Sequence, residues 1–166
     1  GLGDVYKRQV YTGALIEVDD NTMTMVAVDG YRMALRREPL ETCDVESLKF
    51  IVPGAALSDL EKICMSPEEP VKIAVGSKHV SFSVGDTVLI SRRLEGEFLN
   101  FRKTVPGDFP IQLKAQRADL IRCTDRVSLI IDDRTKNPLR CVFGENMLTI
   151  TCATPLGRAE DCCPLE

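Results

Sequence analysis

Short apolar runs separated by turn residues dominate the first part of the chain. The runs GALIEV (13–18) and MTMVAV (23–28) are joined by Asp19-Asp20-Asn21, and Asp29-Gly30 separates the second run from YRMALRR (31–37). Runs of this length with turn residues between them are typical of β-strands. The pattern therefore predicts a sheet that begins near residue 13.

A helix and three further strands are predicted next. LKFIV (48–52) runs into Pro53, which suits a helix start because its fixed φ is helical and its missing N–H is not needed there. Leu57, Leu60 and Cys64 recur on one face of a helix that we expect to end near Met65. Strands follow at VKIAVG (71–76), HVSFSVG (79–85) and TVLISRRL (87–94), and GEFLNFRKTVP (96–106) closes the unit.

A similar order restarts after Pro110. IQLKAQ (111–116) predicts a strand, and ADLIRCTDRVSLII (118–131) predicts a helix that buries Leu120, Cys123, Val127 and Ile131. Residues 140–163 predict three strands, with turns at 144–146 and 155–157. This repetition indicates an α+β chain in which each domain is an antiparallel sheet with a helix packed on one face.

The same pattern suggests how the chain is divided. Residues 1–9 have no apolar period, and we expect them to be a foreign or mis-joined start. One domain is then expected over residues 10–108, and the start of a second, truncated one over 109–166. The linker from Val105 to Pro110 contains two prolines and a glycine, so it should be extended and fairly stiff.

Composition and charge exclude several classes of function. The net charge of -4 excludes a polycation that grips nucleic acid by bulk electrostatics. The seven cysteines include no C-x-x-C pair and there is one histidine, so we expect no metal and reduced, mostly buried thiols in a cytoplasmic protein. Aromatic residues make up 5% of the chain and tryptophan is absent, so we expect no cofactor. We find no apolar run of membrane-spanning length and no signal peptide, so we expect no membrane partner.

Catalytic chemistry has few candidates. The chain contains no G-x-S-x-G, H-E-x-x-H or phosphate-binding loop. A cysteine–histidine dyad at His79, or a divalent metal at Asp19-Asp20 or Asp132-Asp133, is formally open, although exposed turn residues explain all three. We therefore expect a binding module and not an enzyme.

Five stretches form motifs in a fixed order. They are VAVDGYRMAL (26–35), IVPGAALSDLEKI (51–63), LISRRLEGEFLNFRKTVP (89–106), ADLIRCTDRVSLI (118–130) and LTITCATPLGRAED (148–161). The first three resemble the second domain of the DNA polymerase III beta subunit family, the bacterial sliding clamps, and the last two resemble the start of its third domain. The resemblance extends from Val10 to Glu166.

The resemblance implies a processivity factor of bacterial DNA replication. The full protein would be a homodimer, a ring of three domains per subunit that encircles duplex DNA without sequence specificity. Its partners would be the replicative polymerase, the clamp loader and repair proteins. A fragment without the first domain and the end of the third should be monomeric. From the residues alone, a repeat-built scaffold unrelated to replication stays open, and a third copy of the unit upstream would exclude it.

The resemblance also implies two sets of site residues. A hydrophobic pocket for partner peptides would use Tyr11, Val28, Gly30, Tyr31, Arg32, Met33, Leu99, Lys103 and Thr104. Val28, Leu99 and Thr104 depart from the threonine, proline and small aliphatic residue that are common in the family, which affects the preferred peptide motif. The DNA-facing residues would be Lys62, Arg122, Arg126, Arg134 and Lys136, although an ordinary solvated helix face explains these charges about as well.

Overall fold

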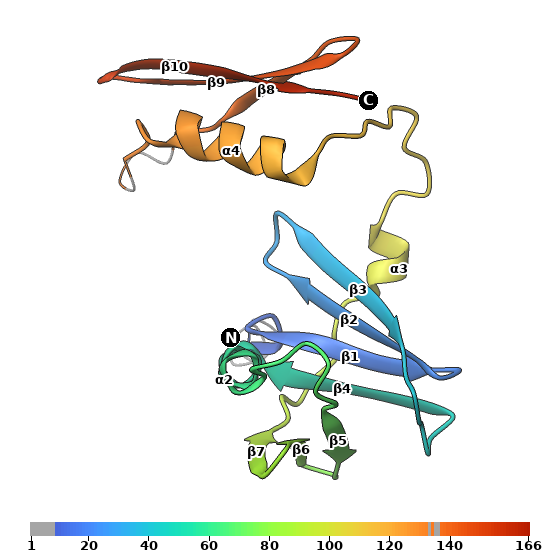
Figure 1. Cartoon of the computed structure of the whole chain (residues 1–166). Helices are drawn as coiled ribbons and strands as arrows, with labels where there is room; N and C mark the ends of the chain where they lie inside the picture. The colour runs from blue at the N-terminus through green and yellow to red at the C-terminus, as the bar shows by residue number, and fades with distance from the viewer. Residues whose placement is uncertain (1–8, 133, 135–136) are drawn as a thin grey trace, which may run out of the picture. The chain divides into compact units, whose positions relative to one another are not determined.

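The computed structural model describes residues 9–132, 134 and 137–166 (Figure 1). The chain divides into two compact units, one that ends at Thr104 and one that runs from Val105 to Glu166. Each unit has its own hydrophobic core. Among the described helices, none combines the length and the apolar character that a membrane span requires.

The first unit is built on a four-stranded antiparallel sheet with the order β3-β2-β1-β4. Its strands are β1 (Gly13–Asp19), β2 (Thr22–Val28), β3 (Met33–Pro39) and β4 (Ser47–Pro53). Asp20 and Asn21 form the predicted turn between β1 and β2, with positive φ angles of 46° and 55°. Asparagine and aspartate tolerate this backbone region well, and it matches the twist of a two-residue hairpin.

Strand β1 is buried on both faces, which explains its nearly continuous apolar sequence. Leu15 points into a cluster with Val26, Ile51, Phe98 and Phe101. The next residue, Ile16, points to the opposite face and packs with Phe50, Val52, Val80 and Phe82. Because successive side chains on a strand alternate between its faces, a single strand supplies both clusters.

Helix α2 (Gly54–Ile63) and a second sheet cover the Ile16 face. This sheet is antiparallel with the order β5-β6-β7, formed by β5 (Lys72–Val75), β6 (His79–Val84) and β7 (Thr87–Arg92). Pro53 precedes the helix as predicted, and Leu57 and Leu60 pack on the cluster. The helix ends two residues before the predicted Met65, and Cys64 is its C-cap.

The Leu15 face is covered by the segment from Leu94 to Thr104, which we call the closing segment. The backbone N–H of Leu94 donates to the carbonyl of Ile51 at 2.9 Å and attaches the segment to β4. Phe98 and Phe101 are buried against the sheet. The segment ends in a short helix, α3 (Phe101–Thr104), that the apolar pattern did not predict.

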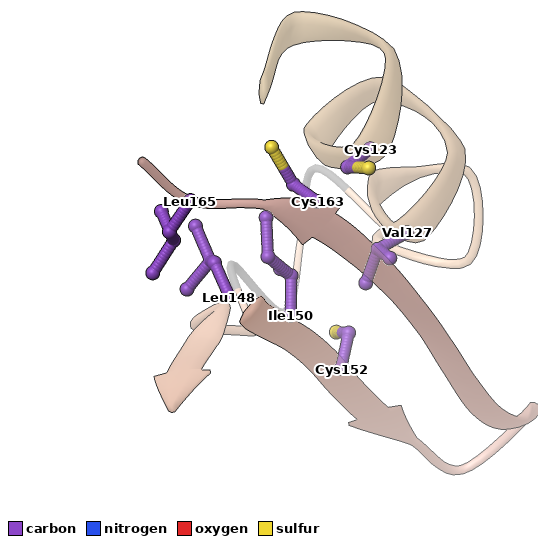
Figure 2. Close-up of a cluster of buried hydrophobic side chains, with 7 residues drawn as sticks. All are labelled: Cys123, Val127, Leu148, Ile150, Cys152, Cys163 and Leu165. Atoms are coloured by element: carbon purple, nitrogen blue, oxygen red, sulfur yellow. The ribbon is translucent and has the colours of Figure 1, made fainter. Parts of the chain in front are cut away.

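The second unit packs helix α4 (Arg117–Ser128) on one face of an antiparallel sheet. The sheet has the order β10-β9-β8, formed by β8 (Arg140–Phe143), β9 (Met147–Thr154) and β10 (Gly157–Pro164). Figure 2 shows Cys123 and Val127 of the helix directed at Ile150, Cys152 and Cys163 of the strands. The predicted α+β class, with antiparallel sheets and helices packed on them, is confirmed in both units.

Two predictions for the second unit are wrong. Residues 111–116 are not a strand, since a strand needs a ladder of backbone bonds to a neighbouring strand. The carbonyl of Lys114 accepts from the N–H of Glu166, and the carbonyl of Gln116 accepts from the first turn of α4. Leu120 is exposed because α4 contacts β9 and β10 through Cys123 and Val127. Ile131 lies beyond the helix and is partly buried against the same core.

Two leucines of the first sheet provide a test of this packing. Leu15 is 0% exposed and Leu35 is 41% exposed. Leu15→Ala should lower the free energy of unfolding of the first unit by about 2–5 kcal/mol, because it leaves a cavity in a closed core. Leu35→Ala should cost much less. Urea denaturation followed by the NMR amide signals of β1 to β4 measures both, and equal losses would contradict the assignment of the core.

Candidate functional site

The turn between β2 and β3, with the two residues at its base, carries five of the predicted peptide-site residues. Val28 and Met33 are paired across its base. Asp29 closes the turn, since its Oδ1 accepts from the backbone N–H groups of Tyr31 and Arg32 at 3.2 Å and its Oδ2 from Arg32 Nε at 2.7 Å. The hydrogen bond from the Arg32 side chain is the main cause that lowers the pKa of Asp29.

The same turn leaves Tyr31 and Gly30 open to solvent. The Tyr31 side chain is fully exposed. Gly30 has a φ of +90°, a region that residues with a Cβ rarely adopt, and no atom lies near the position that its Cβ would take. The turn therefore presents accessible backbone beside the paired Val28 and Met33.

An apolar patch lies beside this turn. Val28, Met33 and Leu99 are partly buried and pack on the cluster that contains Phe98 and Phe101. The ring of Tyr11 meets Phe98 edge to face at a centroid distance of 5.6 Å and is 38% exposed. We call Tyr11, Val28, Met33 and Leu99 the apolar patch. The structure thus brings together four predicted residues that are separated along the chain.

The remaining predicted residues lie on α3 and are exposed. Asn100 caps this short helix, because its carbonyl accepts from the backbone N–H of Lys103 and from Thr104 Oγ1, both at 3.1 Å. Lys103 and Thr104 follow directly on the buried Phe101. Their position therefore depends on how the closing segment is held against the sheet.

Glu17 is a polar residue of this region that sequence reasoning missed. Its carboxylate is 12% exposed and pairs with Lys49 Nζ at 3.3 Å and with Arg102 Nη2 at 2.7 Å. Burial acts to raise the pKa of Glu17, but hydrogen bonds from Arg102 and Lys49 outweigh it and the pKa is lowered. A lone carboxylate in the apolar run GALIEV was the available signal.

The predicted DNA-facing cations are mostly paired with acids. Lys62 contacts Asp59 at 3.0 Å, and Arg122 pairs with Asp119. Both cations are exposed and lie one helical turn from their partners. The backbone N–H of Arg134 donates to Asp132 Oδ1 at 2.9 Å, and its side chain is exposed. Lys136 lies outside the described residues.

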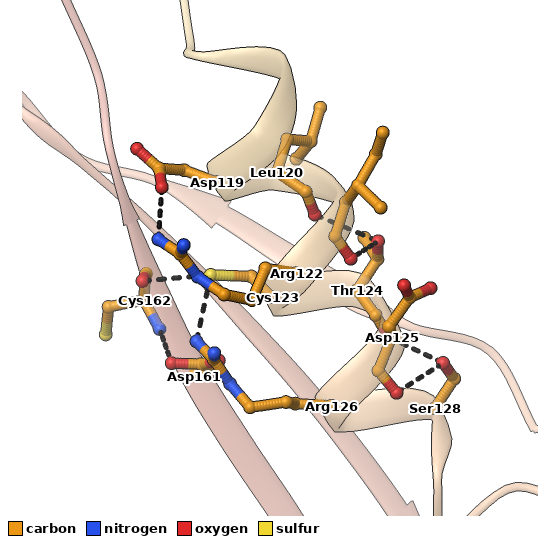
Figure 3. Close-up of polar contacts among 11 residues, drawn as sticks. Asp119, Leu120, Arg122, Cys123, Thr124, Asp125, Arg126, Ser128, Asp161 and Cys162 are labelled. Atoms are coloured by element: carbon orange, nitrogen blue, oxygen red, sulfur yellow. Dashed lines mark hydrogen bonds and ion pairs between the residues drawn. The ribbon is translucent and has the colours of Figure 1, made fainter.

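Arg126 forms an ion pair with the sheet of its own unit. Its Nε donates to Asp161 Oδ2 of β10 at 2.5 Å, and its Nη2 lies 3.8 Å from Cys123 Sγ (Figure 3). Asp161 draws the guanidinium toward its own sheet because an ion pair between neighbouring elements is more favourable than a solvated arginine beside an unpaired carboxylate. Arg126 is therefore turned toward β10.

The cysteines and carboxylates that could have suggested catalysis or metal binding are dispersed. All seven cysteines are free, and burial raises the pKa of the Cys123 thiol, which donates to the carbonyl of Cys162 at 3.0 Å. Cys141 and Cys162 are exposed and two further cysteines are half-buried, so the prediction that most thiols are buried is wrong. Asp19 and Asp20 line an open hollow with Asp44 and Glu46, and no group of metal-binding geometry occurs among the described residues.

Comparison with known proteins decides the family. A profile of the central domain of the DNA polymerase III beta subunit matches residues 2–100, a range that includes most of the stretch we expected to be foreign. The chain belongs to this family. The profile ends shortly before the boundary between the two compact units.

Curated relatives and solved structures agree with the family. The beta sliding clamp of Staphylococcus epidermidis is 32% identical over 148 residues, which are 89% of this chain and 39% of that protein. The Staphylococcus aureus clamp is 30% identical over the same shares. A putative DNA polymerase III beta subunit from Eubacterium rectale has the same fold, with a TM-score of 0.86 at 24% identity over 95% of this chain and 43% of that one. The Bacillus subtilis sliding clamp has a TM-score of 0.82 at 22% identity over 98% and 48%.

The Arg126–Asp161 pair should stabilise the second unit of this clamp-family chain in a pH-dependent way. The backbone N–H of Cys162 and the side chain of Arg126 lower the pKa of Asp161 below 3.8. A carboxyl whose pKa is lower in the folded state stabilises the fold while it is charged, so the contribution is present at neutral pH and is lost as the pH falls through the folded pKa.

Asp161→Asn should therefore lower the urea midpoint of the second unit at neutral pH, and its difference from the unmodified chain should shrink below pH 3.8. Asp125→Asn, at an exposed position on α4, is the matched control and should change little. NMR amide signals of α4 report the midpoints. A difference that persists undiminished in acid would rule out this ion pair as its cause.

Proposed function

We propose that the chain is part of a sliding clamp, the processivity ring of the bacterial replicative DNA polymerase. The chain spans 39% of the length of the curated relatives it matches, so the ring, its homodimeric state and its partners are proposed for the whole protein. Family membership supports this, and the curated relatives are named as beta sliding clamps. The observation that carries it is the apolar patch beside the β2–β3 turn.

The apolar patch fits a short extended peptide with bulky apolar side chains and a glutamine. Partly buried side chains of the patch already rest on a packed core, so a peptide can complete their burial without rearranging the sheet. Met33 is unbranched and adapts to different apolar partners. Gly30 lets a peptide backbone approach closely, and the exposed Tyr31, Arg32, Lys103 and Thr104 would flank the bound peptide. The polymerase, the clamp loader and repair proteins would share this site.

A weak electrostatic grip suits a protein that must slide. Tight phosphate contacts release counterions and hold a protein in place, whereas enclosure retains DNA without stopping it. Lys62 and Arg122 are exposed but neutralised by Asp59 and Asp119 on their own helices. With Arg126 paired to Asp161, Arg134 and Lys136 remain as further candidates for phosphate contacts.

Two further properties belong to this proposal. It has no catalytic role, and binding carries its whole function. It acts in the cytoplasm, where replication takes place and where free thiols such as the exposed Cys141 and Cys162 stay reduced.

Peptide titration tests the site. Labelled with ¹⁵N and titrated with a clamp-binding peptide, the chain should show shifts at the amides of 30–33 and 99–104. Met33→Asp should weaken binding by about a hundredfold, because it sets an unpaired carboxylate against apolar anchors. Met65→Asp is the matched control, since Met65 is 88% exposed and outside the patch. Shifts confined to other segments, or full affinity in Met33→Asp, would refute the site.

DNA binding gives an independent test. The chain should bind duplex DNA weakly and without sequence preference, with a dissociation constant above about 1 µM at physiological salt. The reason is that its net charge is -4 and that Lys62, Arg122 and Arg126 are paired with acids. Fluorescence anisotropy with two duplexes of unrelated sequence, across a salt series, measures this. Sub-micromolar affinity at physiological salt, or discrimination between the duplexes, would contradict a sliding role.

A further inference from the structure

Glu17 occupies an unusual position for a carboxylate. It lies in β1 on the same face as Leu15, directly opposite the buried Thr24 of β2 and Lys49 of β4. This is the face that the closing segment covers. Removing a charge from water costs free energy unless partners compensate it, and here Lys49 and Arg102 do so.

The two partners of Glu17 connect different parts of the unit. Lys49 lies on β4, which is already bound to β1 by a backbone ladder from Gly13 to Asp19. Arg102 lies on α3, and its guanidinium also stacks over the ring of Phe101 at 4.6 Å from the centroid. Of the two ion pairs of Glu17, the one with Arg102 therefore joins the closing segment to the sheet, and the one with Lys49 does not.

The Arg102–Glu17 ion pair restrains the orientation of α3, which the apolar contacts of the closing segment do not. Phe98 and Phe101 hold the closing segment by apolar burial, which restrains its depth but weakly restrains its rotation. An arginine–carboxylate contact at 2.7 Å fixes distance and orientation. Leu99 belongs to the apolar patch, and Lys103 follows Arg102 directly, so rotation of α3 would displace both.

We propose that Glu17 is a positioning residue of the peptide site, which acts through Arg102 to hold α3 and Leu99 in the orientation that receives a peptide. The inference rests on the proposed peptide site and deepens it. Glu17 does not touch the peptide; its effect is transmitted by the closing segment.

Four variants separate positioning from general stabilisation. Glu17→Gln and Arg102→Met remove the link to α3 and should weaken binding of a clamp-binding peptide by about tenfold, the size expected for loss of one charge-assisted hydrogen bond. Arg102→Lys keeps the cation and should restore most of the affinity. Lys49→Met removes the ion pair between Glu17 and β4, which does not involve α3. This variant should bind the peptide with nearly the affinity of the unmodified chain, even if its urea midpoint falls.

A measurement without peptide reports on α3 itself. The N–H of Lys103, in α3, donates to the carbonyl of Asn100, which precedes the helix, so its hydrogen exchange should accelerate in Glu17→Gln and Arg102→Met and stay unchanged in Lys49→Met. If the unmodified chain binds no peptide, the proposed site is wrong and the positioning role falls with it. If it binds and the Glu17 and Arg102 variants bind equally well, or if Lys49→Met weakens binding as much as they do, the positioning role alone is wrong.

Discussion

The first unit depends on the burial of β1 on both of its faces. Leu15 and Ile16 are adjacent in sequence, yet each is completely enclosed by a different set of side chains. One face needs α2 and the β5-β6-β7 sheet, and the other needs the closing segment. Exposure of apolar side chains on either face of β1 would cost free energy. The β5-β6-β7 sheet, α2 and the closing segment therefore all pack on this one strand.

The apolar patch follows from the way the second of these faces is covered. The closing segment is narrow, so it buries Phe98 and Phe101 but leaves Val28, Met33 and Leu99 partly exposed at its margin. Exposed apolar groups beside an ordered core are suited to binding, because their orientation is set before a partner arrives. The same covering segment carries Lys103 and Thr104, so the fold and the proposed site share one support.

Charge is distributed differently in the two units. In the first, Glu17 is partly buried and links three elements through Lys49 and Arg102. In the second, the acids of α4 and β10 neutralise neighbouring arginines, as in the Asp119–Arg122 and Arg126–Asp161 pairs (Figure 3). Each of these pairs places a carboxylate beside a guanidinium and so weakens the local electrostatic field of the arginine. Neutralised arginines of this kind agree with the proposed role, in which DNA is enclosed without tight phosphate contacts.

The sequence by itself determined the local features: the turn at Asp20 and Asn21, the helix after Pro53, the strands β1 to β10 in their order, and the family motifs. These depend on residues near one another along the chain, where backbone preference and apolar period act directly. Only the tertiary structure decided that 111–116 lacks a ladder, that Leu120 is exposed, that Arg126 turns to Asp161, and that Glu17 meets Arg102. Each of these depends on which distant element lies opposite, and no local period encodes that.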